Sequence, residues 1–523
     1  MVQKKLKSSL LISLVLILAL SLAIITVVYF KAESMVVDFL DRKLPHHVQL
    51  EYESIDVNVF TGDVELKDIT VQLLNRDSML VHTKVEMEAL ALNGLSYWQF
   101  FVKKNIDVDR LNLERPIVEH YQSKVLPQQD KERQGVVQLL KTIEIEALNV
   151  VDGQLTLFQK EEDSMALEAK KINFSLMNAK TGPEQIKERI PITYGHYRFA
   201  TENVFVDLGP YEQLQVGTII LDDGDAKVKD LNLRSKFSKA ELSRKIRTER
   251  DHIVLNIPET TLDSIHVGFK NDTLSVSTGP GLITKPVAEI FRDKLTDDDM
   301  THKKLYSKML RELPIYIKVP KVAISGGRLL YSERIEANVA PGQISFDDLT
   351  AVLLNISNRP ENVTKTTVAA EANLMDHAPI SLDWSFDVSK INDAFTASGV
   401  IHDFKTGSIN AFLESNLRAR AKGTINRMYF TVSGDAISSS GDMKMKYEDF
   451  EFSVLKKNRL GVNKLLTAIG NLFVNDGSNS DVDGFRYGSI AVERDPTKSF
   501  FNYLWLNVKE GTINTMIGKS EKK

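Results

Sequence analysis

Residues whose types could support chemistry are present, but their spacing completes no known site. Gly518-Lys519-Ser520 resembles the end of a phosphate-binding loop, yet Ile513 stands where the first glycine of that loop belongs. Asn479-x-Asp481-x-Asp483-Gly484 resembles the start of a calcium-binding loop, yet Ile490 occupies the position of the bidentate glutamate. The pair His46-His47 has no cluster of carboxylates or cysteines nearby. We interpret these segments as a basic tail, a polar surface loop and two solvated histidines.

The composition argues against several whole classes of function. The chain has no cysteine, which excludes disulfides, thiolate metal ligands and a cysteine nucleophile. The 10 histidines are scattered, and no Gly-x-Ser-x-Gly motif occurs. The net charge is −4 with both signs interspersed, so there is no basic surface of the kind that binds nucleic acid. We therefore predict a protein that is not an enzyme, holds no cofactor or metal, and has no nucleic-acid partner.

An N-terminal apolar run predicts a membrane anchor. Its core, Leu10 to Phe30, would form a helix about 31 Å long, which matches the thickness of a bilayer. Lys4, Lys5 and Lys7 precede it, so the N-terminus is expected in the cytoplasm and the bulk of the chain on the far side. A cleaved signal peptide is the alternative, but the run continues well beyond the candidate cleavage site Ser21-Leu22-Ala23. The predicted anchor includes Leu10, Leu16, Leu20, Ile24, Val28 and Phe30.

Most of the remaining chain shows the period-two alternation of β-strands. Ile55, Val57 and Val59 alternate with polar residues before a turn predicted at Thr61-Gly62-Asp63. The same pattern predicts turns at Asp152-Gly153 and Gly326-Gly327, each between two strands. Further strands are predicted at 216–221, 252–257, 380–388, 428–433 and 443–447.

A loose internal repeat accompanies these strands. The segment 62–71 is echoed at 224–233 and more weakly at 342–349. In each segment the apolar alternation shifts by one residue at an aspartate, which a β-bulge would permit without moving the apolar face. Because short strand patterns also recur by chance, the sequence leaves both duplication and coincidence open.

Helical spacing interrupts the alternation in a few places. We predict a short amphipathic helix at 31–44 and helices within 285–313, where Thr296 and the following acids resemble an N-cap. Helical faces are also predicted at 462–473 and 500–508. The aromatic residues of 500–505 could seal a core or lie on a membrane or partner, and core packing is favoured because amphipathic faces usually pack internally. The predicted regions are therefore 1–30 (cytoplasmic tip and anchor), 31–284 (β-rich), 285–313 (helical insertion), 314–456 (β-rich) and 457–523 (C-terminal helices and tail).

The pattern as a whole resembles the AsmA-like envelope proteins, which are similar to TamB and to the chorein-type bridge-like lipid transfer proteins. The most family-like phrase runs from Ile106 through Leu113 and Pro116 to Val118-Glu119. The segments 90–95, 148–157, 322–331 and 493–505 extend the resemblance over most of the chain. The resemblance implies an inner-membrane protein with a periplasmic body, made of a long curved β-sheet whose concave face is apolar.

We expect a mainly β fold: an elongated, twisted antiparallel β-sheet groove, or a chain of β-sandwich modules, with a few short helices after one transmembrane helix. The leading functional hypothesis is phospholipid handling and outer-membrane homeostasis, with membrane lipids as partners. The alternative is a scaffold of closed β-modules that binds another envelope protein. An apolar sheet face must be covered by a sheet, helices or ligand, and sequence alone does not decide which. The candidate groove residues are Ile55, Val57, Val59, Val64, Leu66, Ile106, Val108, Leu155, Leu157, Ile315, Ile317 and Val319.

Overall fold

The computed structural model describes residues 44–75, 79–96, 99–103, 105–125, 142–160, 163–358, 364–456 and 480–517. The predicted anchor at 10–30 and the predicted helix at 462–473 lie outside these residues, as do the Gly518-Lys519-Ser520 motif and all but the last residue of the predicted helix at 31–44. Among the described residues, no helix combines the length and apolarity needed to cross a membrane.

The chain divides into two compact units: unit 1 is 1–207 with 218–223, and unit 2 is 208–217 with 224–523. The fold is mainly β, and the described strands belong to one 24-stranded mixed sheet rather than to separate sandwich modules. The strands of unit 1 are β1 (Val48–Glu51), β2 (Ser54–Asn58), β3 (Asp63–Leu74), β4 (Val81–Asn93), β5 (Ile106–Glu114), β6 (Ile117–Tyr121), β7 (Ile143–Phe158), β8 (Met165–Thr181) and β9 (Tyr197–Asp207). Its short helical turns are η1 (Gln99–Lys103), η2 (Gln122–Lys124) and η3 (Gln185–Lys187).

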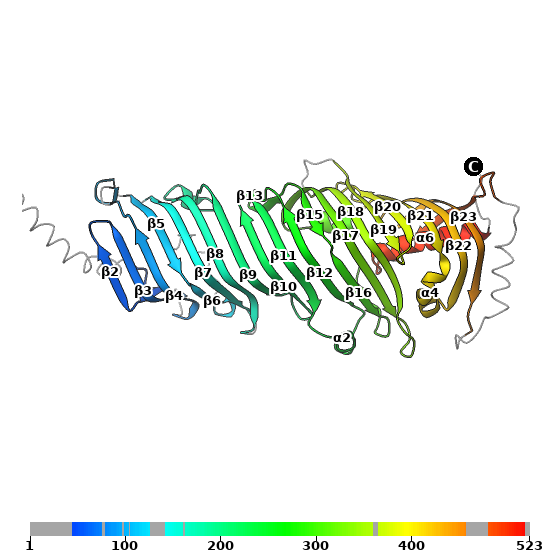
Figure 1. Ribbon diagram of the computed structural model, residues 1–523, viewed down its shortest axis with the longest axis horizontal. Coiled ribbons are helices and arrows are strands. Elements are labelled where there is room, and N and C mark those ends of the chain that lie inside the picture. Colours follow the sequence, from blue (N-terminus) through cyan, green and yellow to red (C-terminus); the bar gives the residue numbers. More distant parts are fainter. Residues whose placement is uncertain are drawn as a thin grey trace, which may run out of the picture. The chain divides into compact units, whose positions relative to one another are not determined.

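Strand β10 (Glu212–Asp222) contributes residues to both units. The other strands of unit 2 are β11 (Asp225–Ser235), β12 (Asp251–Leu262), β13 (His266–Lys270), β14 (Thr273–Ser277), β15 (Gly281–Thr284), β16 (Val287–Asp293), β17 (Tyr316–Arg334), β18 (Gly342–Ser357), β19 (Thr366–Leu374), β20 (Ala378–Phe386), β21 (Phe395–Lys405), β22 (Ala419–Gly434), β23 (Ser438–Val454) and β24 (Arg486–Glu493). Its helices are α2 (Lys239–Lys245), α3 (Tyr306–Arg311), η4 (Thr406–Ile409), α4 (Asn410–Leu417) and α6 (Phe500–Ile517), and Figure 1 shows α6 across one face of the last strands.

The sheet is mixed, so the expectation of a wholly antiparallel sheet is wrong. Strands β5 and β6 run parallel to β7, and strands β14, β15 and β16 run parallel to β17. The alternation of half-buried residues looks the same in parallel and antiparallel strands. The direction of a strand depends instead on the connection that precedes it, because parallel neighbours require a crossover.

Left-handed residues are present at the three repeated aspartates, but the strand pairing keeps its register past Asp68 (β3 with β4) and past Asp230 (β11 with β12). It shifts register only beside Asp348, so the predicted β-bulge is confirmed there and is wrong for these pairings of the other two. Asp68 in β3, Asp230 in β11 and Asp348 in β18 have positive φ angles of 50°, 53° and 51°. In β3 the residues on either side of Lys67-Asp68, Leu66 and Ile69, are both buried, whereas the two residues between them are exposed. The left-handed residue therefore shifts the alternation by one position and keeps the apolar side chains on the same face, without an extra residue opposite β4.

Two predicted turns are bulges instead. Asp152-Gly153 lies in the middle of β7, and Gly326-Gly327 lies in the middle of β17. Asp152 and Gly326 have positive φ angles of 53° and 66°, and the strand pairing shifts register beside both glycine pairs. A left-handed residue suits a turn and a bulge equally well, and these two positions became bulges because partner strands continue on both sides of them.

The structure supports an internal duplication. The turn glycine of the first segment, Gly62, accepts a hydrogen bond from the backbone N–H of Leu95 at 2.9 Å. Its counterpart Gly224 accepts one from the backbone N–H of Ile265 at 2.7 Å. Both glycines have positive φ, at 76° and 96°.

The same correspondence holds further along both units. A proline separates β5 from β6 and another separates β15 from β16, and each proline carbonyl accepts a bond from the long strand beside it. Gln154 N–H donates to the Pro116 carbonyl at 2.7 Å, and Arg328 N–H donates to the Pro286 carbonyl at 2.8 Å. Strands β3 to β8 and β11 to β18 thus repeat one pattern. The segment 342–349 lies in β18, the counterpart of β8, and is no separate copy.

The helical insertion predicted at 285–313 is largely wrong. Residues Val287–Asp293 form β16, and only Tyr306–Arg311 form a helix, α3. The Thr296 hydroxyl donates to the Asp293 carbonyl oxygen at 3.0 Å, and no helix begins there. Strand β16 is apolar on both faces, since the adjacent residues Ile290 and Phe291 point to opposite faces and neither is exposed. Apolar residues on both faces of a strand imitate helical spacing.

Candidate functional site

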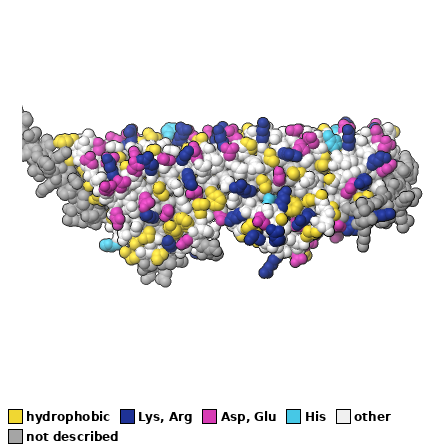
Figure 2. Space-filling model, turned by 60° about the horizontal axis from the view of Figure 1, so that its bottom comes forward, with side chains coloured by type: hydrophobic (Ala, Val, Ile, Leu, Met, Phe, Trp, Pro, Cys, Tyr) yellow, Lys and Arg dark blue, Asp and Glu magenta, His cyan; other side chains and the backbone are white. Residues whose placement is uncertain are grey.

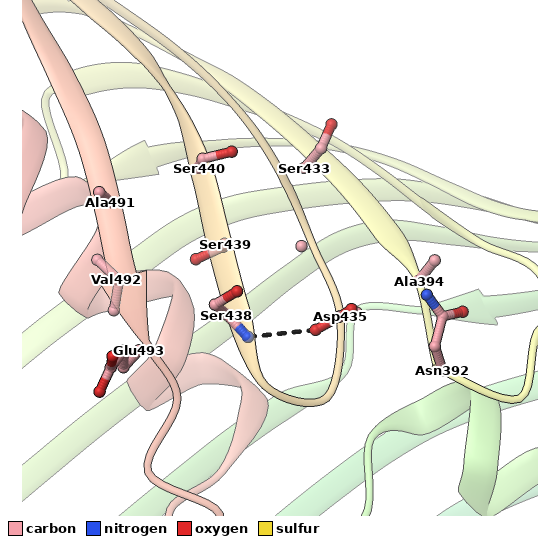
Figure 3. A pocket seen from close by; sticks show the side chains of 11 residues that line it. Asn392, Ala394, Ser433, Asp435, Ser438, Ser439, Ser440, Ala491, Val492 and Glu493 are labelled. Atoms are coloured by element: carbon pink, nitrogen blue, oxygen red, sulfur yellow. Dashed lines mark hydrogen bonds between the residues drawn. The ribbon is translucent and has the colours of Figure 1, made fainter.

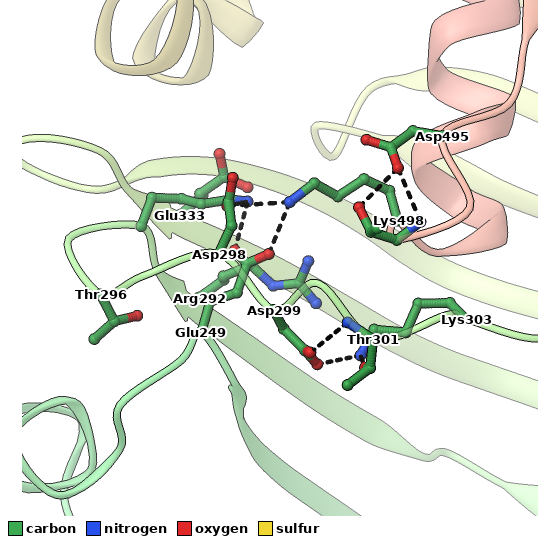
Figure 4. Close-up of polar contacts among 12 residues, drawn as sticks. Glu249, Arg292, Thr296, Asp298, Asp299, Thr301, Lys303, Glu333, Asp495 and Lys498 are labelled. Atoms are coloured by element: carbon green, nitrogen blue, oxygen red, sulfur yellow. Dashed lines mark hydrogen bonds and ion pairs between the residues drawn. The ribbon is translucent and has the colours of Figure 1, made fainter.

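Charged side chains of unit 2 gather where the loops beside β12 and β16 meet the segment before α6 (Figure 4). The Lys498 Nζ lies 3.0 Å from Glu249 Oε1 and 3.1 Å from Asp298 Oδ1, and the Lys294 Nζ lies 2.5 Å from Glu249 Oε2. Burial raises the pKa of Glu249, but hydrogen bonds from Lys294 and Lys498 outweigh it, and the pKa is lowered. A carboxylate that acts as a general base near neutral pH needs a raised pKa, whereas the pKa of Glu249 is lowered. We therefore interpret this cluster as a structural ion-pair network that joins the loops to the segment before α6.

A polar hollow of about 590 Å³ lies beside the hairpin that joins β22 to β23 (Figure 3). Ser433, Ser439 and Ser440 line it together with Asp435 and Glu493. The Asp435 carboxylate accepts backbone N–H groups of its own turn, from Ile437 at 2.8 Å and Ser438 at 3.2 Å. The carboxylate therefore shapes the hairpin, and the hollow presents no paired acid and base.

The structure gives no support to a metal site in the described part of the chain. The Asp481 carboxylate accepts the backbone N–H groups of Asp483 at 3.0 Å and Phe485 at 2.9 Å, together with the Tyr487 hydroxyl at 2.7 Å. It is thus engaged in its own turn. Within the described residues, no group of three or more His, Asp or Glu side chains could hold a metal ion.

Apolar side chains form continuous rows across the sheet of unit 1. Directly paired residues of neighbouring strands place their side chains on the same face. One row crosses β3, β4, β5, β7, β8 and β9 at Leu66, Leu90, Leu113, Val150, Phe174 and Phe199. A second row consists of Val71, Val85, Val118, Leu155 and Ala169. We call the face that carries these rows the apolar face of unit 1.

The apolar face of unit 1 is only half covered. Most of its residues are half-buried, and its tightest cluster contains just Leu66, Ile69 and Met87 as buried members. The described part of unit 1 includes no α-helix, only the short turns η1, η2 and η3. In Figure 2, charged side chains dominate the upper part of the view and apolar side chains gather in patches lower down. A half-covered apolar face of this kind is a candidate binding surface.

The sheet of unit 2 shows what a covered face looks like. Around strands β20 to β24 the core includes Val432, Met443 and Met445, with Met443 only 1% exposed. Helices α4 and α6 contribute to this core, and the ring centroids of Phe500 and Phe395 lie 5.2 Å apart. The aromatic segment that opens α6 therefore belongs mainly to the core, as the sequence favoured.

The structure places the predicted groove residues as follows. In unit 1, Ile55 and Val57 of β2 pair with Leu66 and Val64 of β3, and Val59 lies just beyond β2. Leu155 lies in the second row, and Leu157 pairs with His120. Ile106 and Val108 pair with Ile143 and Ile145 of β7. Ile317 and Val319 lie in β17 of unit 2, and Ile315 directly precedes that strand. All of these side chains are buried or half-buried.

Sequence analysis missed several members of the rows and one polar group. Phe174 belongs to the alternation Ile172, Phe174, Leu176, which was visible in the sequence. By contrast, His82 and His120 lie in different strands, and no local pattern indicates that Thr83 joins them by hydrogen bonds of 2.8 Å to each ring.

No known family model and no curated protein matches the chain.

Proposed function

We propose that this chain is a non-enzymatic lipid-handling protein of the cell envelope. The N-terminal helix would anchor it in the inner membrane, with its bulk in the periplasm. The apolar face of unit 1 would form a groove that shields phospholipid acyl chains while the headgroups stay in water, and so serve lipid transport and outer-membrane homeostasis. Each buried methylene contributes about 0.8 kcal/mol, so a few apolar rows suffice to hold a chain.

The observation that carries this proposal is the contrast between two apolar sheet faces, one in each unit. In unit 2 the apolar side chains around Val432 are fully buried beneath α4 and α6. In the described part of unit 1, rows such as Leu90, Leu113 and Val150 stay half-buried and have no α-helix above them. A protein that needed only a stable core would cover both faces, because exposed contiguous apolar surface promotes aggregation.

Site-specific photo-cross-linking in the full-length chain tests the proposal. A photoreactive amino acid at Leu113 or Val150 reports what lies on the apolar face. The matched controls are their sequence neighbours Asn112 and Asn149, whose side chains hydrogen bond to each other at 2.9 Å. These asparagines alternate with the row residues and so occupy the opposite face. We expect phospholipid adducts, identified by mass spectrometry, at Leu113 and Val150 and few at the asparagines.

Other outcomes would decide against lipid handling. Equal adducts at all four positions, or none at any, would contradict a lipid-binding face. Reproducible adducts to one protein at Leu113 and Val150 would favour the alternative, a scaffold that binds another envelope protein. The closed core of unit 2 around Phe500 supports this alternative, because a sheet whose apolar face is already covered is suited to protein contacts rather than to lipid.

A further inference from the structure

A polar group interrupts the apolar face of unit 1. The cross-strand row Leu73, Thr83, His120, Leu157 has apolar residues at both ends and polar residues between them. Thr83 is buried, and its Oγ1 lies 2.8 Å from His120 Nδ1 and 2.8 Å from His82 Nδ1. The two imidazole rings lie edge to face with centroids 5.9 Å apart. We call His82, Thr83 and His120 the imidazole pair with its bridging threonine.

The internal duplication shows that the fold does not require this polarity. Thr83 of β4 pairs with His120 of β6, and the corresponding positions of unit 2 are Ile253 of β12 and Ile290 of β16, which also pair. The correspondence is fixed by the prolines that directly precede β6 and β16. The same backbone thus accommodates two isoleucines. A threonine and a histidine in place of an apolar pair carry a desolvation penalty, because buried polar groups lose their contact with water. We therefore look for a function of the polar pair rather than a role in folding.

The hydrogen bonds among these three side chains allow one imidazole to take up one more proton. The Thr83 hydroxyl can donate to only one Nδ1, so the other imidazole donates its Nδ1–H to the Thr83 oxygen. In this neutral arrangement one ring carries its proton on Nε2, and the other ring has an Nε2 free to accept. Protonating that free Nε2 breaks no existing hydrogen bond. Both His82 and His120 then present Nε2–H donors.

The surroundings disfavour that extra charge unless an anion is present. Burial lowers the pKa of His82, and repulsion from His120 and His47 lowers it further. The Nε2 of His47 is itself buried with no hydrogen-bond partner. The lowered pKa keeps His82 neutral at neutral pH.

The neighbouring charged groups Lys84, Glu86 and Glu119 already have partners. Lys84 forms an ion pair with Glu86 on the same strand, and Glu119 accepts a hydrogen bond from the Tyr121 hydroxyl at 3.2 Å. No carboxylate contributes to the shift of the His82 pKa. A bound anion would therefore be the group that stabilises the one extra proton of the imidazole pair.

We propose that His82, Thr83 and His120 bind the phosphate diester of a phospholipid whose acyl chains lie on the neighbouring apolar rows. This rests on the proposed function and names its headgroup site. Two Nε2–H donors and one positive charge can bind two oxygens of a phosphate. Hydrogen bonds of this charge-assisted kind are stronger than hydrogen bonds between neutral groups. Binding tightens as the pH falls towards 6, because the proton that the site needs is then easier to supply. Inorganic phosphate shares this chemistry and serves as a competitor.

The test uses the full-length chain with a photoreactive amino acid at Leu157, which pairs with His120. The probe is a detergent micelle with equal amounts of dioleoylphosphatidylglycerol and dioleoylglycerol, which share acyl chains and differ in the phosphate. At pH 6 we expect phosphatidylglycerol adducts to exceed dioleoylglycerol adducts about tenfold, the effect of one charge-assisted hydrogen bond. The excess should shrink at pH 8 and in the presence of inorganic phosphate.

The variant T83I/H120I introduces the residue pair that unit 2 already carries, so it should fold. We expect it to keep its total lipid adducts and lose the preference for phosphatidylglycerol. The matched control I253V/I290V alters the corresponding positions of unit 2 and should keep the preference. A preference that survives T83I/H120I, or is absent from the wild-type chain, overturns the headgroup site.

A second measurement separates this inference from the proposed function. Histidine hydrogen–deuterium exchange followed by mass spectrometry gives the pKa of His82 with and without inorganic phosphate. Lipid adducts without headgroup preference overturn the site and leave lipid handling intact. An absence of lipid adducts, together with a His82 pKa that phosphate raises, refutes lipid handling and identifies free phosphate as the ligand. No adducts and an unchanged pKa overturn both.

Discussion

At the scale of single residues, left-handed backbone positions shape the strands. Aspartates such as Asp230 tolerate positive φ because a short polar side chain can form local hydrogen bonds. At position 224 only glycine fits without strain, since a Cβ there would lie 2.9 Å from the Ile265 carbonyl oxygen. Gly209 has nearly the same backbone conformation, with φ of +100° against +96°, but a Cβ there would meet nothing within 4 Å.

These two glycines give a matched prediction in unit 2. We expect Gly224→Ala to lower the free energy of unfolding by about 2 to 3 kcal/mol, because left-handed strain and a close backbone contact act together. Gly209→Ala should cost only about 1 kcal/mol, from the backbone strain alone. Urea unfolding followed by tryptophan fluorescence measures both. Equal losses would show that the contact with the Ile265 carbonyl is unimportant.

At the scale of elements, α6 is the cover of the C-terminal part of the unit 2 sheet. Its buried side includes Phe500 and Tyr503, and the amide of Asn507 accepts a hydrogen bond from the Ser439 hydroxyl at 2.8 Å. The neighbouring residue Phe501 faces outward and is 58% exposed, against 4% for Phe500. The helix therefore packs on the sheet through one side only, and the adjacent residues Phe500 and Phe501 have opposite environments.

Adjacent phenylalanines make the second stability prediction. Phe500→Ala removes a buried ring that stacks on Trp384 at 4.6 Å between centroids, and should cost about 3 to 4 kcal/mol. Phe501→Ala should cost less than about 1 kcal/mol, since its ring is mostly in water. Thermal unfolding of the full chain compares them. If Phe501→Ala were the more damaging change, α6 would have to pack through its other side.

At the scale of the whole molecule, the proposed function requires attachment to a membrane. Unit 1 offers a half-covered apolar face, and unit 2 contains a face closed by its own helices. Neither feature fixes a location. Attachment rests on the apolar run from Leu10 to Phe30, which the sequence predicts as a single crossing with a cytoplasmic N-terminus.

Alkaline carbonate extraction tests this attachment. The wild-type chain should remain in the membrane pellet. The variant L16R/L20R should be released or fail to insert, because each arginine near the centre of a crossing costs about 2.5 to 3.5 kcal/mol. Gln49→Arg, at an exposed position of β1, is the control and should stay in the pellet. Release of the wild-type chain would contradict an uncleaved anchor.

Local sequence patterns were enough to predict the strand-rich fold class, the alternation that marks strands such as β2 and β3, and the start of α6 at the aromatic segment. These depend on local periodicity, which each segment carries within itself. The sequence also indicated the irregular positions at Asp68 and Asp230, because a one-residue shift in alternation is visible without knowing the partner strand.

Tertiary structure decided what depends on a partner. Asp152-Gly153 carries the same local signal as a turn, but it lies inside β7 because neighbouring strands continue past it on both sides. Val287 and Ile290 imitate a helix, but they form β16 because β12 and β17 supply its backbone hydrogen bonds. The imidazole pair arises in the same way: strand pairing alone brings His120 to Thr83, from a position 37 residues along the chain.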